Sequence, residues 1–142
     1  MRPQPLIAVT DVEASSRWYQ RLLGCRSDHG GSVYERLKSR DGALILQLHR
    51  FGVEHHHGPI GDRGDKPYGN GVLLWFELDD FDAAVARATE MGADIVMPRH
   101  RNPPDTDSGP NHWECWLRDP DGYMVVICSP DGTADGTWRP SS

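Results

Sequence analysis

The stretch Gly71–Ala93, GVLLWFELDDFDAAVARATEMGA, predicts a strand that leads directly into a helix. Val72–Leu78 is the predicted strand. Phe81–Met91 is the predicted helix, because apolar residues recur in it at spacings of three and four. Asp80 is a suitable N-cap for this helix, and Gly92 suits the left-handed residue that often follows a helix end.

A weaker copy of this pattern lies near the N-terminus. There the chain passes from a strand through Asp11 into a helix that stops at Leu23-Gly24. Asp11 and Asp80 are 69 residues apart, and a glycine follows each of them 13 or 12 residues later. An internal repeat of this kind predicts two modules with the same order of elements.

The remaining predicted elements fall into two similar sets. In the first half we expect the helix Val12–Leu23 and the extended segments Gln4–Thr10, Cys25–Asp28, Val33–Lys38 and Ala43–Arg50. The second half adds the strands Ile95–Met97, His112–Arg118 and Tyr123–Cys128. Segments rich in Gly and Pro predict two long loops, Gly52–Gly71 and Pro98–Pro110. Each half is thus expected to contain a strand, a helix and three further strands.

The length of 142 residues fits one domain made of two half-domains. We expect a single domain over residues 1–130, with modules at about 4–52 and 70–129, and a flexible tail over residues 131–142. The net charge of −6 and the lack of a Lys/Arg cluster argue against a nucleic-acid-binding surface.

The cysteines and the N-terminus bear on location. Cys25, Cys115 and Cys128 are odd in number, and their spacing matches no disulfide scaffold or paired-thiol metal motif. Reduced cysteines in a cytoplasmic protein are therefore expected. The N-terminal sequence MRPQPLIAV has no long apolar run, so we expect neither a signal peptide nor association with a membrane.

Three motifs, in this order and at these spacings, make the sequence resemble the vicinal oxygen chelate superfamily. This superfamily includes glyoxalase I, bleomycin-resistance proteins and extradiol dioxygenases. The motifs are Val9–Ser15 with Trp18-Tyr19 and Leu22-Leu23-Gly24, then Phe76–Ala84 with Met91-Gly92-Ala93, then Leu117–Tyr123. The resemblance extends over roughly residues 4 to 130. It implies an α+β fold in which tandem βαβββ modules form a half-open β-barrel, usually in a homodimer.

The resemblance also implies where a metal would bind. In the enzymes of this superfamily, side chains on the first and fourth strands of both modules hold a divalent metal that substrate oxygens chelate. The implied positions fall on Gln4, on Gln47, near Gly71–Leu73 and on Val126. Two neutral amides opposite apolar side chains are poor ligands for a divalent cation. The sequence therefore favours the metal-free branch of the superfamily, and no cofactor is expected at these positions.

The expected function is metal-independent binding of a small aromatic or polycyclic ligand in the barrel cavity, for resistance or sequestration. The alternative is a metal-dependent lyase, isomerase or dioxygenase with a shifted ligand set. The sequence leaves open whether the protein is an enzyme. A metal-free enzyme would use His49 or Glu77 as a general base.

Strand alternation assigns side chains to the cavity. In Leu44–His49 the Leu residues should face a helix, which places Gln47 and His49 on the other face. The expected ligand-binding residues are Gln4, Gln47, His49, Leu73, Trp75, Glu77, Met124, Val126 and Cys128. An apolar wall with an aromatic ring and a few polar groups is typical of small-molecule pockets. Trp75 and Cys128 also fit a simple packing role.

Two other clusters offer alternative sites. The run His55-His56-His57 would hold a transition metal only if a special turn made the imidazoles converge. On the predicted strand His112–Arg118, alternation puts His112, Glu114 and Trp116 on one face. If that face lines the cavity, His112 and Glu114 are candidates for a relocated metal or acid–base site. Otherwise solvent or a dimer partner covers it.

Overall fold

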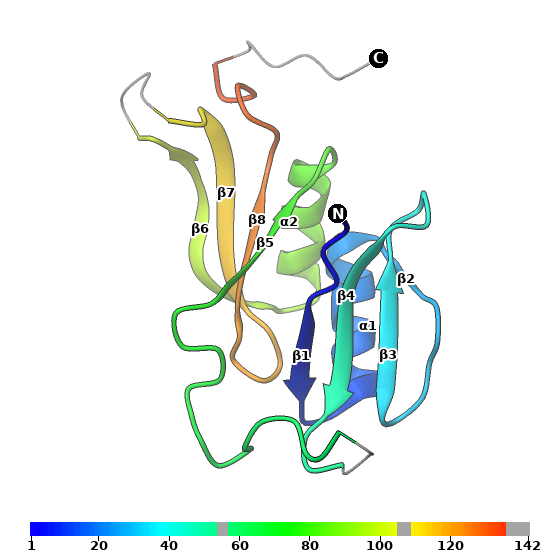
Figure 1. Cartoon of the computed structure of the whole chain (residues 1–142). Helices are drawn as coiled ribbons and strands as arrows, with labels where there is room; N and C mark the ends of the chain where they lie inside the picture. Colours follow the sequence, from blue (N-terminus) through cyan, green and yellow to red (C-terminus); the bar gives the residue numbers. More distant parts are fainter. Residues whose placement is uncertain (54–56, 105–108, 136–142) are drawn as a thin grey trace. The chain divides into compact units, whose positions relative to one another are not determined.

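The computed structural model describes residues 1–53, 57–104 and 109–135, and it divides into two compact units. Unit 1 comprises Met1–Asn70 and Pro120–Gly122, and unit 2 comprises Gly71–Asp119 and Tyr123–Ser142. Each unit contains one helix and one four-stranded sheet with parallel and antiparallel pairs, so the fold class is α+β (Figure 1). The part of the predicted tail over residues 136–142 lies outside the described residues.

Unit 1 is a complete βαβββ module. Its elements are β1 (Leu6–Val9), α1 (Val12–Leu23), β2 (Arg26–Ser27), β3 (Tyr34–Lys38) and β4 (Leu44–Arg50). The strand order is β1-β4-β3-β2, with β1 parallel to β4 and the other neighbours antiparallel. A parallel pair needs a crossover connection, and α1 lies in the chain that joins β1 to the other strands.

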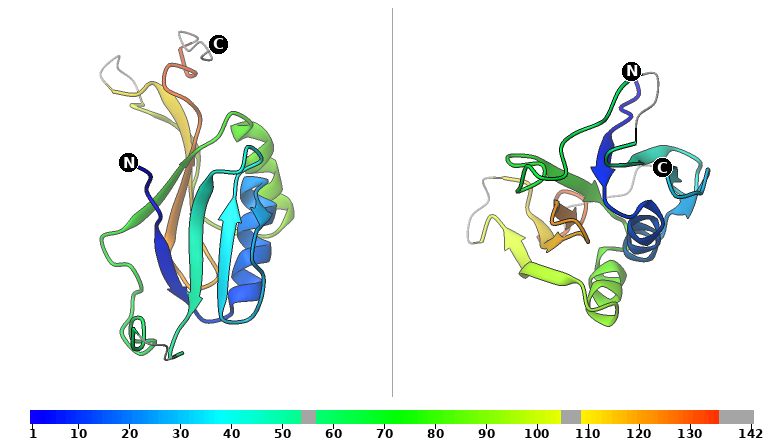
Figure 2. Two further views of the ribbon diagram at one scale, coloured as in Figure 1. Left: turned by 45° about the vertical axis from the view of Figure 1, so that its right-hand side comes forward. Right: turned by 90° about the horizontal axis from the view of Figure 1, so that it is seen from below.

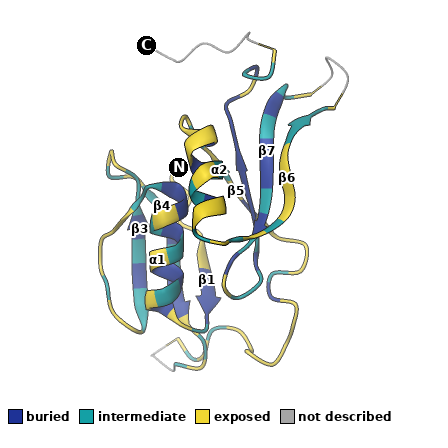
Figure 3. Cartoon of the chain, turned by 180° about the vertical axis from the view of Figure 1, so that it is seen from behind, coloured by how far each residue is buried: buried dark blue, intermediate teal, exposed yellow. Residues whose placement is uncertain are grey.

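Helix α1 covers one face of the unit 1 sheet (Figure 2). The Asp11 carboxylate caps its N-terminus by accepting the Ala14 N–H at 3.0 Å, and Gly24 ends it in the left-handed conformation at φ 67°. Its inward face includes Tyr19 and Leu22, which are fully buried together with the sheet residues Leu37, Leu46 and Leu48. Figure 3 shows the opposite side of the helix as exposed. The expected packing of the β4 leucines is thus confirmed.

Unit 2 repeats the same order of elements. It contains β5 (Leu73–Glu77), α2 (Phe81–Glu90), β6 (Asp94–Asn102), β7 (His112–Arg118) and β8 (Met124–Cys128). The strand order is β5-β8-β7-β6, with β5 parallel to β8. The 69-residue offset places Leu6 at Trp75, and the structure pairs Leu6 with Gln47 and Trp75 with Val126 in the same way. The predicted repeat is therefore confirmed.

Arg99 shows which face of the unit 2 sheet meets α2. Its guanidinium lies 3.8 Å from the centroid of the Trp113 ring on β7 and 6.0 Å from that of the Phe81 ring on α2. The Arg99 Nε also donates to the Asp82 carboxylate at 3.0 Å. Trp113 therefore points to the helix side of the sheet. Because side chains alternate along a strand, His112 and its same-parity neighbours point to the other side.

The prediction for the segment after Met97 was wrong. A short strand followed by a loop from Pro98 was expected, but β6 continues to Asn102. Proline cannot donate a hydrogen bond to a sheet, yet β6 lies at the end of the strand order, where one side needs no partner. The pairing with β7 also shifts in register between Met97 and His100, so Pro98 falls in an irregularity.

The predicted capping role of Asp80 was also wrong. Asp80 occupies the N-cap position of α2, but its side chain makes no capping hydrogen bond. Its Oδ2 instead accepts from the Arg87 guanidinium at 3.0 Å, within the same helix segment. Gly92 does adopt the predicted left-handed conformation, at φ 64°.

The turn Asp119–Gly122 has a clear structural role. Both carboxylate oxygens of Asp121 lie 3.2 Å from the backbone N–H of Thr10, just before α1, and Thr10 and Asp121 both belong to unit 1. Within unit 2, the Asp119 carboxylate accepts the Tyr123 N–H at 2.9 Å. Over the described residues, neither helix is long and apolar enough to cross a membrane.

Candidate functional site

A buried carboxylate, Glu114, lies at the centre of the polar network of unit 2. It projects from β7 on the sheet face opposite α2, and 2% of the residue is exposed. Its Oε1 accepts from the Asn102 amide at 2.7 Å and from His112 Nε2 at 2.8 Å. Its Oε2 accepts from the Trp116 indole N–H at 2.9 Å, and His100 Nε2 lies 3.4 Å away. Both carboxylate oxygens are therefore already engaged.

These contacts fix the charge state of Glu114. Burial raises the pKa of its carboxyl, but hydrogen bonds from Asn102, Trp116 and His112, and the attraction of the His112 ring, outweigh that effect. The pKa of Glu114 is consequently held below its ordinary value. An anion that accepts this many hydrogen bonds is a poor general base, since its lone pairs are not available to a substrate proton.

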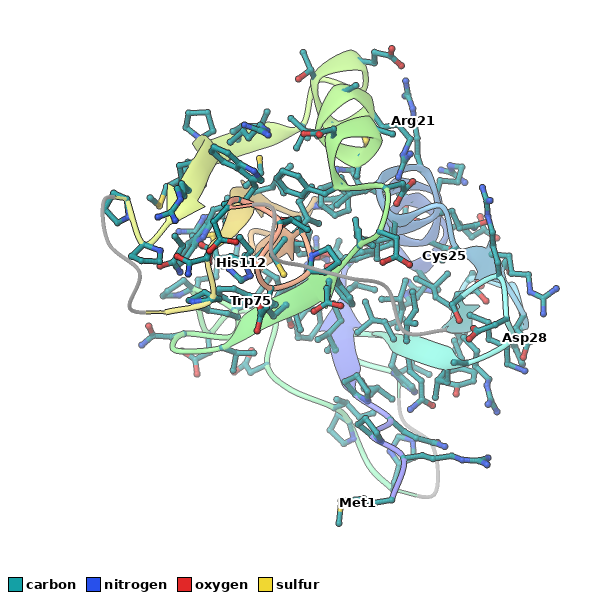
Figure 4. The ribbon with its side chains drawn as sticks, turned by 90° about the horizontal axis from the view of Figure 1, so that it is seen from above. Met1, Arg21, Cys25, Asp28, Trp75 and His112 are labelled. Atoms are coloured by element: carbon teal, nitrogen blue, oxygen red, sulfur yellow. The ribbon has the colours of Figure 1, made fainter. Side chains whose placement is uncertain are left out.

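His112 connects this buried carboxylate to the surface. Its ring is buried, with Nε2 on Glu114 and Nδ1 3.2 Å from the carboxylate of Asp131, which is exposed. Its neighbour on the same face is Trp75, whose ring centroid lies 6.3 Å away at an interplanar angle of 36°. Figure 4 shows both side chains, which belong to β5 and β7. An aromatic group and a polar network thus adjoin each other.

Trp75 is an exposed apolar residue of β5, as is Leu73 on the same face. Trp75 is the middle residue of β5 and is 43% exposed. Its indole N–H donates to the Cys128 sulfur at 3.0 Å. The Trp116 ring lies 6.3 Å away, centroid to centroid, and is nearly perpendicular to it at 76°. The sulfur contact holds one edge of the Trp75 ring, and Trp116 forms an adjacent aromatic wall.

Cys128 serves as a support and not as a nucleophile. Burial raises the pKa of its thiol to about 11, the Trp75 hydrogen bond lowers it, and the charges of Glu77, Glu114 and Asp131 raise it further. A thiol with such a pKa stays protonated near neutral pH and is unreactive. In the strand register, Glu77 on β5 and Glu114 on β7 flank Cys128.

The strand register arranges this sheet face in three rows. We call it the Trp75 face. Its rows across β5, β8 and β7 are Leu73, Met124 and Arg118, then Trp75, Val126 and Trp116, then Glu77, Cys128 and Glu114. Residues that pair across a sheet point to the same side. The structure thus brings together every unit 2 residue that alternation assigned to a cavity, and it adds His112 and Glu114 to them.

Unit 1 has a separate cluster on the sheet face opposite α1. The Tyr34 hydroxyl donates to the Gln47 side-chain oxygen, and the Gln47 side-chain nitrogen donates to the backbone carbonyl of Gln4 at 3.0 Å. His49 is buried, and its Nδ1 lies 2.9 Å from the Arg50 carbonyl. The Gln47 amide is therefore engaged at both ends. Gln4 itself lies before β1 and is exposed, so its predicted place within the first strand was wrong.

His57 is the one member of the triple-histidine run among the described residues. Its ring lies 5.5 Å from that of His49, centroid to centroid, and its Nδ1 lies 2.6 Å from the Gly58 carbonyl. His55 and His56 lie outside the described residues. The alternative of a metal site in this run therefore rests in part on residues outside those described.

Comparison with known proteins identifies the family. The profile of the Glyoxalase/Bleomycin resistance protein/Dioxygenase superfamily matches residues 3–127. The chain belongs to this superfamily. No curated protein matches the sequence.

Solved structures share the superfamily fold. TioX from Micromonospora sp. ML1 is 21% identical with a TM-score of 0.66, over 92% of this chain and 98% of that one. Lactoylglutathione lyase from Agrobacterium tumefaciens is 17% identical with a TM-score of 0.64, over 96% of both chains. A glyoxalase/bleomycin resistance protein/dioxygenase from Alicyclobacillus acidocaldarius is 17% identical with a TM-score of 0.59, over 94% of this chain and 95% of that one. At these identities the likeness establishes the fold.

The superfamily resemblance implies a metal, and the side chains at the implied positions do not fit one. In unit 1, the Gln47 oxygen already accepts from Tyr34, and Gln4 contributes its backbone carbonyl to Gln47. In unit 2, Gly71–Leu73 offers no side-chain donor, and Val126 is buried and has none. Over residues 1–53, 57–104 and 109–135, no group of three or more His, Cys, Asp or Glu is arranged to hold an ion.

Sequence reasoning missed three residues of these clusters. His100 and Asn102 contact Glu114 from β6, which was expected to end at Met97. His100 and Asn102 are two residues apart, as residues on one face of a strand are, but a proline such as Pro98 is disfavoured inside a strand. Tyr34 was assigned to a strand without a role. Its position opposite His49 follows only from the β3–β4 register, which the sequence does not reveal.

Proposed function

We propose that the protein binds a small, flat aromatic molecule on the Trp75 face of unit 2 without a metal ion. The observation that carries this proposal is the exposed Trp75 ring, held at its edge by Cys128 and flanked by the perpendicular Trp116 ring. A bound aromatic ring can stack on one indole and meet the edge of the other. Sequestration of such a molecule is the role that this geometry supports best.

The polar network supports a binding role over a catalytic one. Glu114 is ionised, buried and bonded on both oxygens, and His112 has a carboxylate at each ring nitrogen. Side chains with all their hydrogen-bonding atoms engaged are rigid, and a rigid wall lowers the entropy cost of binding. A metal-free enzyme would use His49 or Glu77 as its general base. Of these, His49 is buried in unit 1 and Glu77 is exposed at the end of β5.

The test is a calorimetric titration with naphthalene-2-methanol, a neutral probe with a flat aromatic ring. We expect Trp75→Ala to weaken binding about fivefold, as the loss of one aromatic pair implies. The matched control is Trp18→Ala, which removes the same side chain from α1 in unit 1 and should leave the affinity unchanged. Equal affinities of the wild-type protein and Trp75→Ala, or no binding by the wild type, would refute the proposal.

A further inference from the structure

The Trp75 face carries opposite charges at its two ends. The row that contains Glu77 also contains Glu114, and the exposed carboxylate of Asp131 reaches the same end through His112. At the other end, the row of Leu73 and Met124 contains Arg118. Trp75, Val126 and Trp116 form the apolar row between them. A flat molecule on the middle row therefore has acidic groups at one end only.

The acidic end stays negative even when its histidines are charged. Glu77 and Glu114 flank Cys128 in the strand register, and the Asp131 carboxylate lies 3.2 Å from His112 Nδ1. The basic groups among them are His112 on β7 and His100 on β6, which both lie against Glu114. A proton added to each imidazole leaves one carboxylate in excess. At the far end, the strand register places Asp94 of β6 opposite Arg118.

Aromatic rings reinforce this preference for a cation. The face of an indole carries negative charge, and a cation within about 6 Å of its centroid is attracted to it. The Trp75 and Trp116 rings meet at a nearly perpendicular corner, which presents the face of one ring beside the edge of the other. Glu77 lies two residues from Trp75 on the same side of β5 and is exposed, so a solvated ammonium can reach it.

We infer that the ligand of the Trp75 face is an aromatic molecule that carries a positive charge at one end, a quaternary or protonated amine, and that this charge lies at the Glu77 end. The inference rests on the proposed function and adds the class of ligand to it. The aromatic part lies over Trp75 and against Trp116. The cationic part lies beside Glu77, within reach of the charges of Asp131 and Glu114.

The test compares three probes that share one ring. They are (naphthalen-2-ylmethyl)trimethylammonium, naphthalene-2-methanol and naphthalene-2-acetate, titrated calorimetrically at one pH. We expect the cation to bind about tenfold more tightly than the alcohol and the anion to bind most weakly. Added salt should lower the affinity for the cation and leave the affinity for the alcohol unchanged, because exposed charges are screened.

Glu77→Gln should remove most of the advantage of the cation and leave the affinity for the alcohol unchanged. Its control is Glu90→Gln, which removes the same charge from the exposed end of α2 and should preserve the advantage. If the alcohol binds in a Trp75-dependent way but the cation gains nothing, or if Glu77→Gln keeps the gain, the inference falls while the proposed function stands. If no probe binds, both fall.

Discussion

The exposed ring of Trp75 and the buried carboxylate of Glu114 make different contributions to the same sheet face. Trp75 offers apolar area that a ligand can cover, whereas Glu114 anchors the side chains around it. A buried carboxylate is tolerated only because it is paired and hydrogen-bonded. Removing one donor would leave a buried charge partly unsatisfied, so Glu114 and its partners behave as a unit.

Unit 1 contains a comparable carboxylate at Glu35, which is 3% exposed and fastens β3 to its surroundings. Its Oε2 accepts from the Ser16 hydroxyl on α1 at 2.8 Å and from the Ser27 hydroxyl on β2 at 2.7 Å. Its Oε1 accepts from the backbone N–H groups of His29, Gly30 and Arg36. Burial raises its pKa, but these hydrogen bonds outweigh that effect and lower the pKa to about 2.

The lowered pKa of Glu35 predicts acid sensitivity. A carboxyl with a folded pKa of about 2, against an ordinary value of 4.5, stabilises the fold above pH 4.5 and loses that contribution as the pH falls towards 2. The contribution is roughly 3 kcal/mol. We expect Glu35→Gln to lower the free energy of unfolding at pH 7 and to flatten its pH dependence below 4.5, as measured by urea denaturation. The control is Glu13→Gln, an exposed change on α1, which should have the same free energy of unfolding as the wild type at each pH. If the pH dependence of Glu35→Gln runs parallel to that of the wild type, Glu35 does not cause the acid sensitivity.

The sequence predicts the placement of some residues of the site but not of others. Alternation along β5 and β8 correctly placed Trp75, Glu77 and Cys128 on one face, because period two is a local property of a strand. The hydrogen bonds that Glu114 accepts could not be predicted in the same way. They depend on donors from β6 and β7 whose positions are set by register and by a bulge, and neither is encoded in a local pattern.

At the scale of elements, the two strand–helix units share a pattern and differ in how their helices begin. Asp11 accepts the Ala14 N–H at the start of α1, whereas Asp80 at the start of α2 binds Arg87 instead. Sequence alone makes these two aspartates look equivalent. An aspartate side chain can accept a hydrogen bond from a backbone N–H or from a guanidinium. Arg87, seven residues after Asp80, provides the guanidinium in α2.

This difference predicts unequal costs for the same substitution. Asp11→Ala should lower the free energy of unfolding by about 1 kcal/mol, the typical loss for an N-cap. Asp80→Ala removes only a partly exposed ion pair, so we expect a loss below about 0.5 kcal/mol. Urea denaturation of the two variants measures both quantities. A loss for Asp80→Ala that equals or exceeds that for Asp11→Ala would mean that the two helices are capped alike.

Strand β6 shows where local rules mislead. Pro98 suggested the end of a strand, and the nine-residue strand Asp94–Asn102 contains it. Because β6 forms the end of the strand order in unit 2, its outer side needs no hydrogen-bond partners there, and proline is acceptable. Whether a strand lies at an edge is a property of the sheet. A single segment of sequence does not carry that information.

At the scale of the whole molecule, we propose a homodimer, and β6 is the surface most suited to the contact. It is one of the two end strands of its sheet, and its apolar residues Val96 and Met97 are 44% and 42% exposed. Unprotected edges with exposed apolar side chains favour association with a second chain. Leu73 and Trp75 on β5, the other end strand of this sheet, are exposed to a similar degree, but they belong to the face proposed to bind a ligand, and Val72 lies just before β5.

Light scattering at micromolar concentration should give about twice the chain mass of 15.9 kDa. Val96→Lys should shift the protein towards the monomer, because it puts a charge in the proposed contact. Val72→Lys makes the same chemical change at a position of similar exposure and should leave the mass unchanged. A monomeric wild type would exclude the dimer, and a dimeric Val96→Lys would exclude this edge as the contact.

The family membership and the order of elements follow from sequence, because three motifs and the repeat extend over nearly the whole chain. The poor fit of a metal at the implied positions is visible in the sequence, since Gln4, Gln47 and Val126 stand there. The structure adds the reason why Gln47 is a poor ligand. Its oxygen is already bonded to Tyr34, a residue with no signal of its own.

We propose that the Trp75 face binds its ligand without a metal. The most direct measurement is the dissociation constant of naphthalene-2-methanol for protein treated with a chelator, then reloaded in turn with nickel, zinc, manganese and iron(II), with the metal content of each sample analysed. We predict one dissociation constant throughout and no stoichiometric ion. Binding that appears only with a stoichiometric metal, and is lost when Glu77→Ala or Glu114→Ala releases that metal, would contradict the claim.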